Sequence, residues 1–363
     1  MRIQIMKFGG TSLSSQELRR TAAANIREAL ERGLTPVVVV SAFGREGDPY
    51  ATDTLLGLAG NQEVRISARE VALLASCGEV IASVVMAETL QQAGVNAVAL
   101  TGGQAGIVTT DCHVGADIAF VERAKLADLL SAGKVPVVAG FQGRTRGGEL
   151  SVLERGGSDI SSTALGHFLQ AEGVDIFTDV PGVMTADPKV VPGARPFKEL
   201  SFGHAHRLSA YGAKVMHPRA FDWAKRSPTP IFVRSIHDAQ SHTRIDDRGA
   251  APSGESAFMG IACRTTDRRR HAVITLVGWG AIDGAASAAF VRDGLQRAGL
   301  SYADLEVFAD AVAVTVRLAL VQEAAHFLHS LCLNQQAEGW AFFEHRLEKS
   351  AIPSDAFLKL AQS

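Results

Sequence analysis

Short aliphatic strand patterns alternate with helix patterns over the first 235 residues, and this alternation constrains the fold more than any other feature of the sequence. Ile3–Phe8 and residues 35–42 enclose a helix pattern at 18–31. The run at 35–42 is β-branched and long enough only for a strand buried on both faces. The sequence therefore predicts one large α/β domain with a mainly parallel sheet. The further predicted strands are 97–100, 135–139, 175–178 and 230–234, after helices at 68–74 and 80–93, 122–130, 161–170 and 219–225.

The pattern changes after this domain. Residues 238–258 are polar, contain Gly and Pro and lack apolar periodicity, which is typical of a linker. Beyond them, strands at 271–277 and 311–320 are each followed by a helix, which fits a small α/β domain. We therefore predict a first domain at 1–237, a linker at 238–258 and a second domain at 259–363.

The composition excludes several classes of protein. Lys and Arg number 36 and Asp and Glu 38, whereas proteins that bind nucleic acid or anionic membranes nonspecifically have one dominant charge sign. The four cysteines stand far apart, so neither a disulfide scaffold nor a structural zinc site is predicted. The charged start is too short for a signal peptide, and no apolar run approaches the ~20 residues that span a bilayer. We expect a cytoplasmic protein with a small-molecule substrate and no nucleic-acid or membrane partner.

The end of the first strand carries the first candidate site. Lys7 and Phe8 run directly into Gly9 and Gly10, ahead of a helix. Two glycines let the backbone approach an anion closely, and the helix that follows offers free N–H groups. The lysine adds positive charge for a phosphate. An ordinary strand-to-helix turn with an incidental lysine is the alternative.

Three later segments add groups of the same kind. Residues 155–159 (RGGSD) place an arginine, two glycines, a hydroxyl and a carboxylate at the start of a helix, where the arginine would bind an acidic ligand bidentately. The serine or aspartate could instead cap the helix. A polar loop at 178–188 offers acceptors for a ribose or a base, or is a turn rich in Asp, Pro and Gly. Residues 212–214 (GAK) bring a second lysine.

Two other patterns indicate different chemistry. Gly278, Gly280 and Gly284 follow a strand and loosely match a dinucleotide-binding turn, although the spacing is one residue too long. His204 and His206 are a candidate metal pair without an evident third ligand, and two surface histidines are the alternative.

Together, the motifs at 7–12, 155–159, 178–182 and 212–214 resemble those of one family, the aspartokinases of the amino acid kinase superfamily. The resemblance covers residues 3–235, and residues 47–53 (GDPYATD) look most like the enzymes of endospore-forming Gram-positive bacteria. It implies a three-layer amino acid kinase fold followed by a small α/β ACT-like domain. The C-terminal part is shorter than the two ACT domains usual in the family, so a shortened ACT region is expected.

The resemblance also implies an activity: ATP, with Mg²⁺ carried by the nucleotide and no metal site on the protein, would phosphorylate the side chain of L-aspartate to 4-phospho-L-aspartate. This is the first step toward lysine, threonine and methionine. The implied catalytic residues are Lys7, Asp159 and Lys214. The implied ATP-binding residues are Lys7, Phe8, Gly9, Gly10, Thr178, Asp179, Met184, Asp187, Lys189 and Lys214. The implied substrate-binding residues are Ser41, Thr52, Glu79, Arg155, Gly156, Gly157 and Ser158, with Arg155 on the α-carboxylate and Glu79 on the α-ammonium group.

The sequence departs from the family pattern at several positions. Glu154 replaces a glycine, Ile160 replaces a hydroxyl residue, and residues 202–206 replace a glutamate-containing pair. Two alternatives therefore stay open: a non-catalytic or weakly active regulatory paralogue, and a kinase of the same fold for another small acid. The shortened tail implies a homodimer through residues 259–363, and a full-length aspartokinase is a further implied partner.

Overall fold

The computed structural model describes residues 1–59, 66–213, 216–227, 229–238, 240–248, 257–266 and 270–333. These residues form two compact units. The first contains residues 1–182 and 216–247, and the second contains the described residues of 183–215 and those from 248 onward. Each unit is described by itself.

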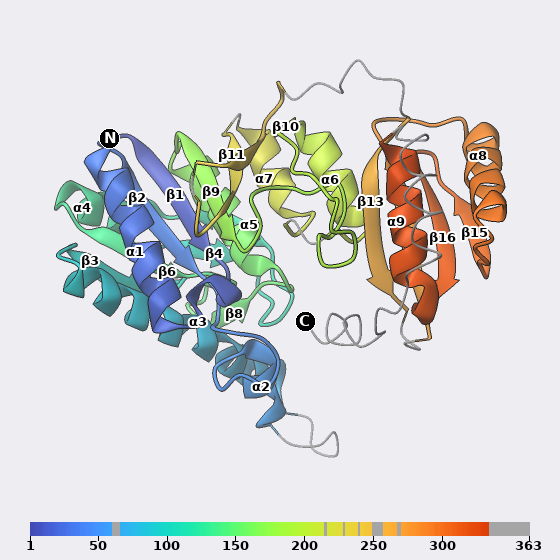
Figure 1. The fold of residues 1–363 in the computed structure, drawn as a ribbon. Helices are drawn as coiled ribbons and strands as arrows, with labels where there is room; N and C mark the ends of the chain where they lie inside the picture. The colour runs from blue at the N-terminus through green and yellow to red at the C-terminus, as the bar shows by residue number, and fades with distance from the viewer. Residues whose placement is uncertain are drawn as a thin grey trace. The chain divides into compact units, whose positions relative to one another are not determined.

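The centre of the first unit is a mainly parallel sheet, which confirms the predicted fold class (Figure 1). Neighbouring strands are parallel except at one edge, where the last pair is antiparallel. The strands that the first unit contributes lie in the order β12 (His242–Ile245), β11 (Ile231–Ser235), β9 (Gly173–Thr178), β1 (Ile3–Phe8), β2 (Thr35–Val40), β6 (Val135–Ala139) and β3 (Ala97–Leu100).

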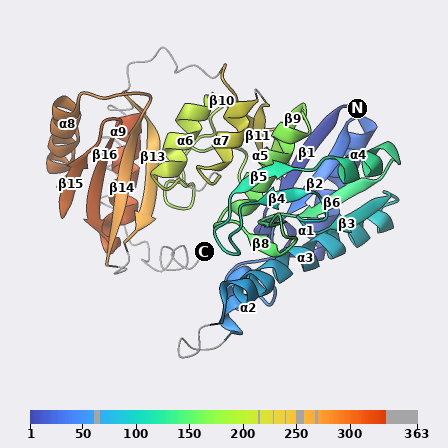
Figure 2. The ribbon, with the colours of Figure 1, turned by 180° about the vertical axis from the view of Figure 1, so that it is seen from behind.

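Helices cover both faces of this sheet and make the three-layer arrangement (Figures 1 and 2). The helices are α1 (Gln16–Glu31), α2 (Thr52–Gly57), α3 (Ala68–Gln92), α4 (Ala124–Ser131), α5 (Gly157–Phe168) and α7 (Ala220–Arg226), with a 3-10 turn at Gly10–Leu13. Met6 of β1 shares a core with Ala22 of α1 and Ala82 of α3. On the other face, Gly166 of α5 packs so closely on β9 that a Cβ would lie 2.7 Å from Val174.

A small second sheet also belongs to the first unit. Its strands lie in the order β5 (Ile118–Val121), β4 (Ile107–Thr109), β7 (Gln142–Arg144) and β8 (Leu150–Val152). All four are four residues or shorter, which is too short for a periodic pattern to identify them in the sequence.

The second unit is built on an antiparallel sheet. Its strands lie in the order β13 (Phe258–Thr265), β14 (His271–Gly278), β16 (Ala311–Arg317) and β15 (Asp304–Val307), with helices α8 (Gly284–Arg297) and α9 (Val321–Cys332). The unit also contains β10 (Glu199–Leu200), α6 (Phe202–Ala210) and a 3-10 turn at Leu318–Leu320. Because β14 is antiparallel to both neighbours, it does not start a parallel strand–helix–strand unit. The dinucleotide interpretation of Gly278, Gly280 and Gly284 is therefore wrong.

The unit boundaries differ from the predicted domains. The predicted linker at 238–258 contains β12, whose alternating Thr243 and Ile245 are fully buried. Residues 183–215 group with the second unit, since Val190 and Val191 share its core with Ile261. Residues 249–256 of the linker and residues 334–363 of the second domain lie outside the described residues.

The helices predicted at 68–74 and 80–93 are one helix, α3. Gly78 does not interrupt it: a Cβ there would lie 2.6 Å from the Cβ of Ala42 and 2.7 Å from the carbonyl oxygen of Tyr50, so the glycine permits close packing. By length and composition α3 is also long and apolar enough to cross a membrane, although Glu79 interrupts its apolar residues. Half of its most apolar window is buried inside the protein, as in the core helix of a globular fold.

Candidate active site

A cavity of about 520 Å³ opens beyond the carboxyl ends of β1 and β2, the edge where α/β sheets usually bind ligands. Residues predicted from distant parts of the sequence meet there. Its lining contains every predicted substrate-binding residue together with Lys7, Gly10 and Asp159.

A buried ion pair marks one end of this cavity. The Nζ of Lys7 lies 2.8 Å from Oδ1 of Asp159, and both side chains are nearly nine-tenths buried. The other oxygen of Asp159 accepts a hydrogen bond of 3.1 Å from the backbone N–H of His217. Asp159 therefore fixes the lysine and ties the chain at 217 to the first turn of α5.

Glycines bring the backbone close to the same place. A Cβ on Gly10 would overlap the carbonyl oxygen of Ala42, so no larger residue fits without moving that strand end. Gly156 has φ of +79° and precedes α5, where a Cβ would lie 2.6 Å from the Cβ of His217. The first residues of α5 line the cavity, and the free N–H groups of a helix N-terminus favour an anion.

Glu79 of α3 is a buried carboxylic acid in the lining. Its Oε1 accepts a hydrogen bond of 3.2 Å from the backbone N–H of Ala42, whereas Oε2 is buried and has no hydrogen-bond partner among the described residues. Burial raises the pKa of Glu79 to about 8, against the smaller opposing effect of the Ala42 N–H. An unsatisfied buried oxygen of this kind suits a cationic or hydrogen-bond-donating ligand.

Arg155 enters the cavity from the loop before α5 and forms a two-pronged ion pair with Asp53 of α2. Nη1 donates to Oδ2 at 3.2 Å and Nη2 donates to Oδ1. The side chain is 84% exposed, so the guanidinium is open to a further carboxylate. Asp53 was not among the predicted site residues, although it stands next to Thr52 in the motif at 47–53. Arg45 and Phe141 also line the cavity, and neither was among the predicted site residues.

The departures from the family pattern have structural explanations in part. Glu154 accepts a hydrogen bond of 2.7 Å from Arg219, which pairs with its negative charge. Ile160 is buried within α5. His204 is also buried, and its Nε2 lies 2.9 Å from the carbonyl oxygen of Trp279. Within the described ranges, no three His, Cys, Asp or Glu side chains gather to hold a metal ion.

The other predicted nucleotide-binding residues that the structure describes do not line this cavity. Phe8 is wholly buried and stacks on Phe177 at 4.5 Å between ring centroids, so its side chain belongs to the core and only its backbone can face a ligand. Gly9 bonds through its N–H to the carbonyl oxygen of Phe177, directly before Thr178 and Asp179 at the end of β9. Three predicted residues belong to the second unit, and Lys214 lies outside the described residues. The three are Met184, Asp187 and Lys189.

Comparisons with known proteins identify the relatives of this chain. The model of the amino acid kinase family matches residues 2–235. Aspartokinase 1 of Bacillus subtilis (strain 168) is 46% identical over 258 residues, which are 71% of this chain and 64% of that protein. The aspartokinase of Geobacillus stearothermophilus is 41% identical over 247 residues, 68% of this chain and 60% of that protein. The chain therefore spans less than two thirds of the length of these relatives.

Among solved structures, E. coli aspartokinase III in complex with aspartate and ADP has a TM-score of 0.64. The match covers 91% of this chain and 84% of that one at 24% identity, and at this identity it shows the fold alone. With the family match over 2–235 and these relatives, the chain belongs to the amino acid kinase family and within it is related to the aspartokinases.

Proposed function

We propose that this chain transfers the γ-phosphoryl group of ATP to the side-chain carboxylate of L-aspartate, forming 4-phospho-L-aspartate and ADP. The observation that carries the proposal is the presence of Glu79 and Arg155 in one cavity beside Lys7. A buried carboxylate with an unsatisfied oxygen suits an α-ammonium group, and an exposed guanidinium suits an α-carboxylate. The names of the relatives, and the aspartate and ADP in the E. coli complex, support this choice of substrates.

The proposed reaction requires the two substrates to be positioned, and it does not require a proton transfer. A side-chain carboxylate has a pKa of about 3.9, so it is already a nucleophile at neutral pH and needs no general base. The protein must align it with the γ-phosphorus and stabilise negative charge on the transferred group. Lys7, held by Asp159, and the N-terminus of α5 supply positive potential at one end of the cavity. We assign the same role to Lys214.

For the nucleoside we propose Thr178, Asp179, Met184, Asp187 and Lys189, with the backbone at 8–10 next to the phosphates. We also propose that Mg²⁺ arrives bound to the β- and γ-phosphates of ATP, where it would neutralise part of their charge.

We also propose a cytoplasmic homodimer joined through residues 259–363. Its support is the edge strand β15, which ends beside the exposed side chains of Val307 and Phe308. A sheet edge with apolar neighbours is a surface that a second copy can cover. Pairing with a full-length aspartokinase through the same edge would follow the same logic.

The activity is tested by measuring ADP release from the full chain with ATP and L-aspartate, while hydroxylamine traps the acyl phosphate as a hydroxamate. We expect ADP and hydroxamate in equal amounts with L-aspartate, and neither product with L-glutamate or without an acceptor. Faster turnover with another small acid would indicate a same-fold kinase with a different substrate. A folded chain that releases no ADP would contradict the proposal and favour the regulatory paralogue.

A further inference from the structure

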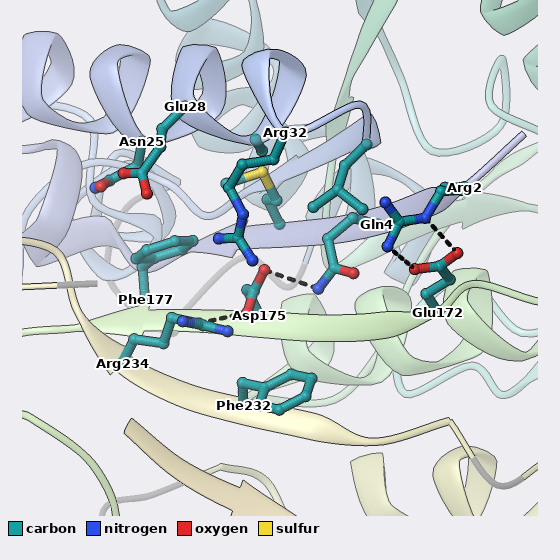
Figure 3. A pocket seen from close by; sticks show the side chains of 13 residues that line it. Arg2, Gln4, Asn25, Glu28, Arg32, Glu172, Asp175, Phe177, Phe232 and Arg234 are labelled. Carbon is teal, nitrogen blue, oxygen red and sulfur yellow. Dashed lines mark hydrogen bonds and ion pairs between the residues drawn. The ribbon is translucent and has the colours of Figure 1, made fainter. Parts of the chain in front are cut away.

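A second cavity, of about 190 Å³, lies on the face of the main sheet that α1 covers. It is enclosed by the last turns of α1 and by β1, β9 and β11 (Figure 3). Its lining includes Arg2 and Gln4 at the start of β1 and Leu34 just before β2, and it shares no residue with the first cavity. A ligand here would therefore not touch the groups assigned to phosphoryl transfer.

The floor of this cavity is a buried charged group. Asp175 of β9 lies on the sheet face that also carries the core residues Met6 and Phe177. Its Oδ1 accepts a hydrogen bond of 2.5 Å from Nε of Arg234, and its Oδ2 accepts one of 2.8 Å from Nε2 of Gln4. Burial raises the pKa of Asp175 and the Arg234 charge opposes that shift. A buried ion pair contributes little net stability compared with apolar packing, so this pair needs a reason other than folding.

The charged groups around the cavity balance. Arg2, Arg32 and Arg234 face Glu28, Glu172 and Asp175 in the lining. Four of these six groups already form ion pairs with one another. Arg234 binds Asp175, and Nε and Nη2 of Arg2 each lie 2.9 Å from an oxygen of Glu172. An ion of one sign would therefore meet as much repulsion as attraction.

One cation and one anion are left for a ligand. In the described ranges, Arg32 forms no ion pair or side-chain hydrogen bond, and Figure 3 shows its side chain pointing from α1 toward Asp175. Glu28 stands one helical turn before Arg32 and accepts only a long bond of 3.4 Å from Gln240. The partly buried ring of Phe232 adds an apolar wall, with the guanidinium of Arg234 5.1 Å from its centre.

We propose that this cavity binds a free α-amino acid, whose carboxylate pairs with Arg32 and whose ammonium group pairs with Glu28. A zwitterion matches the balanced lining, whereas a lone anion or cation does not. The cavity volume of about 190 Å³ leaves room for a small amino acid.

The test measures binding by calorimetry, so it does not depend on kinase activity. The full chain with Arg155→Ala is titrated with L-alanine, L-valine, L-threonine and L-lysine, because this variant weakens amino-acid binding in the first cavity. Acetate and methylamine serve as half-molecules that carry only one of the two charges. Arg32→Ala and Glu28→Gln are then added singly, with Arg20→Ala, an exposed arginine on the same helix, as the matched control.

We expect at least one amino acid to bind, with an affinity that falls about tenfold or more in both the Arg32→Ala and the Glu28→Gln protein and is unchanged by Arg20→Ala. The half-molecules should not bind measurably. Binding of none of the four amino acids would overturn the proposal. Binding that survives Arg32→Ala, or equal binding of acetate, would overturn it as well, the second by indicating a simple anion site. With any of these contrary results, the ion pair between Asp175 and Arg234 would serve only to join β9 and β11. The activity measured as ADP release with L-aspartate would be unaffected by that outcome.

Discussion

The Nζ of Lys7 lies 2.8 Å from Oδ1 of Asp159, which joins the end of the first strand to the first turn of α5 across 152 residues of sequence. The pair is buried and opens onto the cavity that contains Arg155 and Glu79. A lysine held in this way cannot collapse onto solvent-exposed carboxylates when no ligand is bound. Its charge is therefore already in place when a phosphate arrives.

Lys7→Ala should lower kcat by about 10²-fold or more while KM for L-aspartate changes little, because charge that grows in the transition state is what the lysine stabilises. Steady-state ADP release checks this. Lys125→Ala, which removes an exposed lysine on α4, is the control. If the Lys7→Ala protein kept near-normal kcat, the assigned role of Lys7 would be wrong.

Arg155→Lys should raise KM for L-aspartate about tenfold and leave KM for ATP nearly unchanged. Lysine keeps the charge but loses the two-pronged geometry that a carboxylate requires. The measurement is the pair of KM values, each at saturating concentration of the other substrate. Equal weakening toward both substrates would place Arg155 at the phosphates instead.

Glu79 predicts a pH dependence. With its pKa raised to about 8, the group is mostly protonated at neutral pH without ligand and must ionise to bind an ammonium group. KM for L-aspartate should therefore fall as the pH rises from about 6.5 to 8.5. Glu79→Gln should raise KM and abolish this trend, and Glu88→Gln on the exposed face of the same helix should not. A wild-type KM that stays flat over this range would exclude the role.

The same shift predicts a change in stability. In the unfolded chain Glu79 ionises near its ordinary pKa of 4.5, whereas in the folded chain it keeps its proton up to about pH 8. The folded state therefore loses stability relative to the unfolded state as the pH rises from 4.5 to about 8. Glu79→Gln should remove that loss. Between pH 5 and pH 8, the free energy of unfolding of the variant should therefore rise by about 1–4 kcal/mol relative to that of the wild type. Urea unfolding at the two pH values measures it.

Gly10→Ala should cost about 1–3 kcal/mol of unfolding free energy and most of the turnover, because its methyl group would overlap the carbonyl oxygen of Ala42. Gly57→Ala is the matched control: no heavy atom lies within 4 Å of its added Cβ, so stability should be unchanged or slightly higher. Urea unfolding and ADP release on both proteins decide the matter. A Gly10→Ala protein as stable and active as Gly57→Ala would contradict the close approach.

Size-exclusion chromatography with light scattering should give about twice the chain mass of 38.4 kDa. Val307→Lys should reduce this to one chain, since lysine on a sheet edge opposes pairing with another chain. Val84→Lys replaces an exposed valine on α3 and should leave the mass unchanged. A wild-type monomer would rule out the proposed dimer.

The local pattern of apolar residues in the sequence was enough to predict much of the secondary structure of the first unit. The predicted strands at 3–8, 97–100 and 135–139 match β1, β3 and β6 residue for residue. Buried parallel strands are largely aliphatic, so their sequence is informative without any neighbour. The glycines at 10, 156 and 157 were identifiable for a similar reason, since close packing around the backbone excludes other residues there.

The tertiary structure decided what depends on contacts between distant segments. It made 68–92 one helix, because Gly78 packs against Ala42 and Tyr50 rather than ending the helix. It placed Asp53 on Arg155, buried Phe8 against Phe177, and assembled the second cavity around Asp175. By itself, the sequence determined the fold class and indicated the residue types of the candidate site, because aliphatic strands and glycine turns are recognisable locally. Ion pairs, burial and pKa values were decided only by the folded chain, because they depend on distances that packing sets.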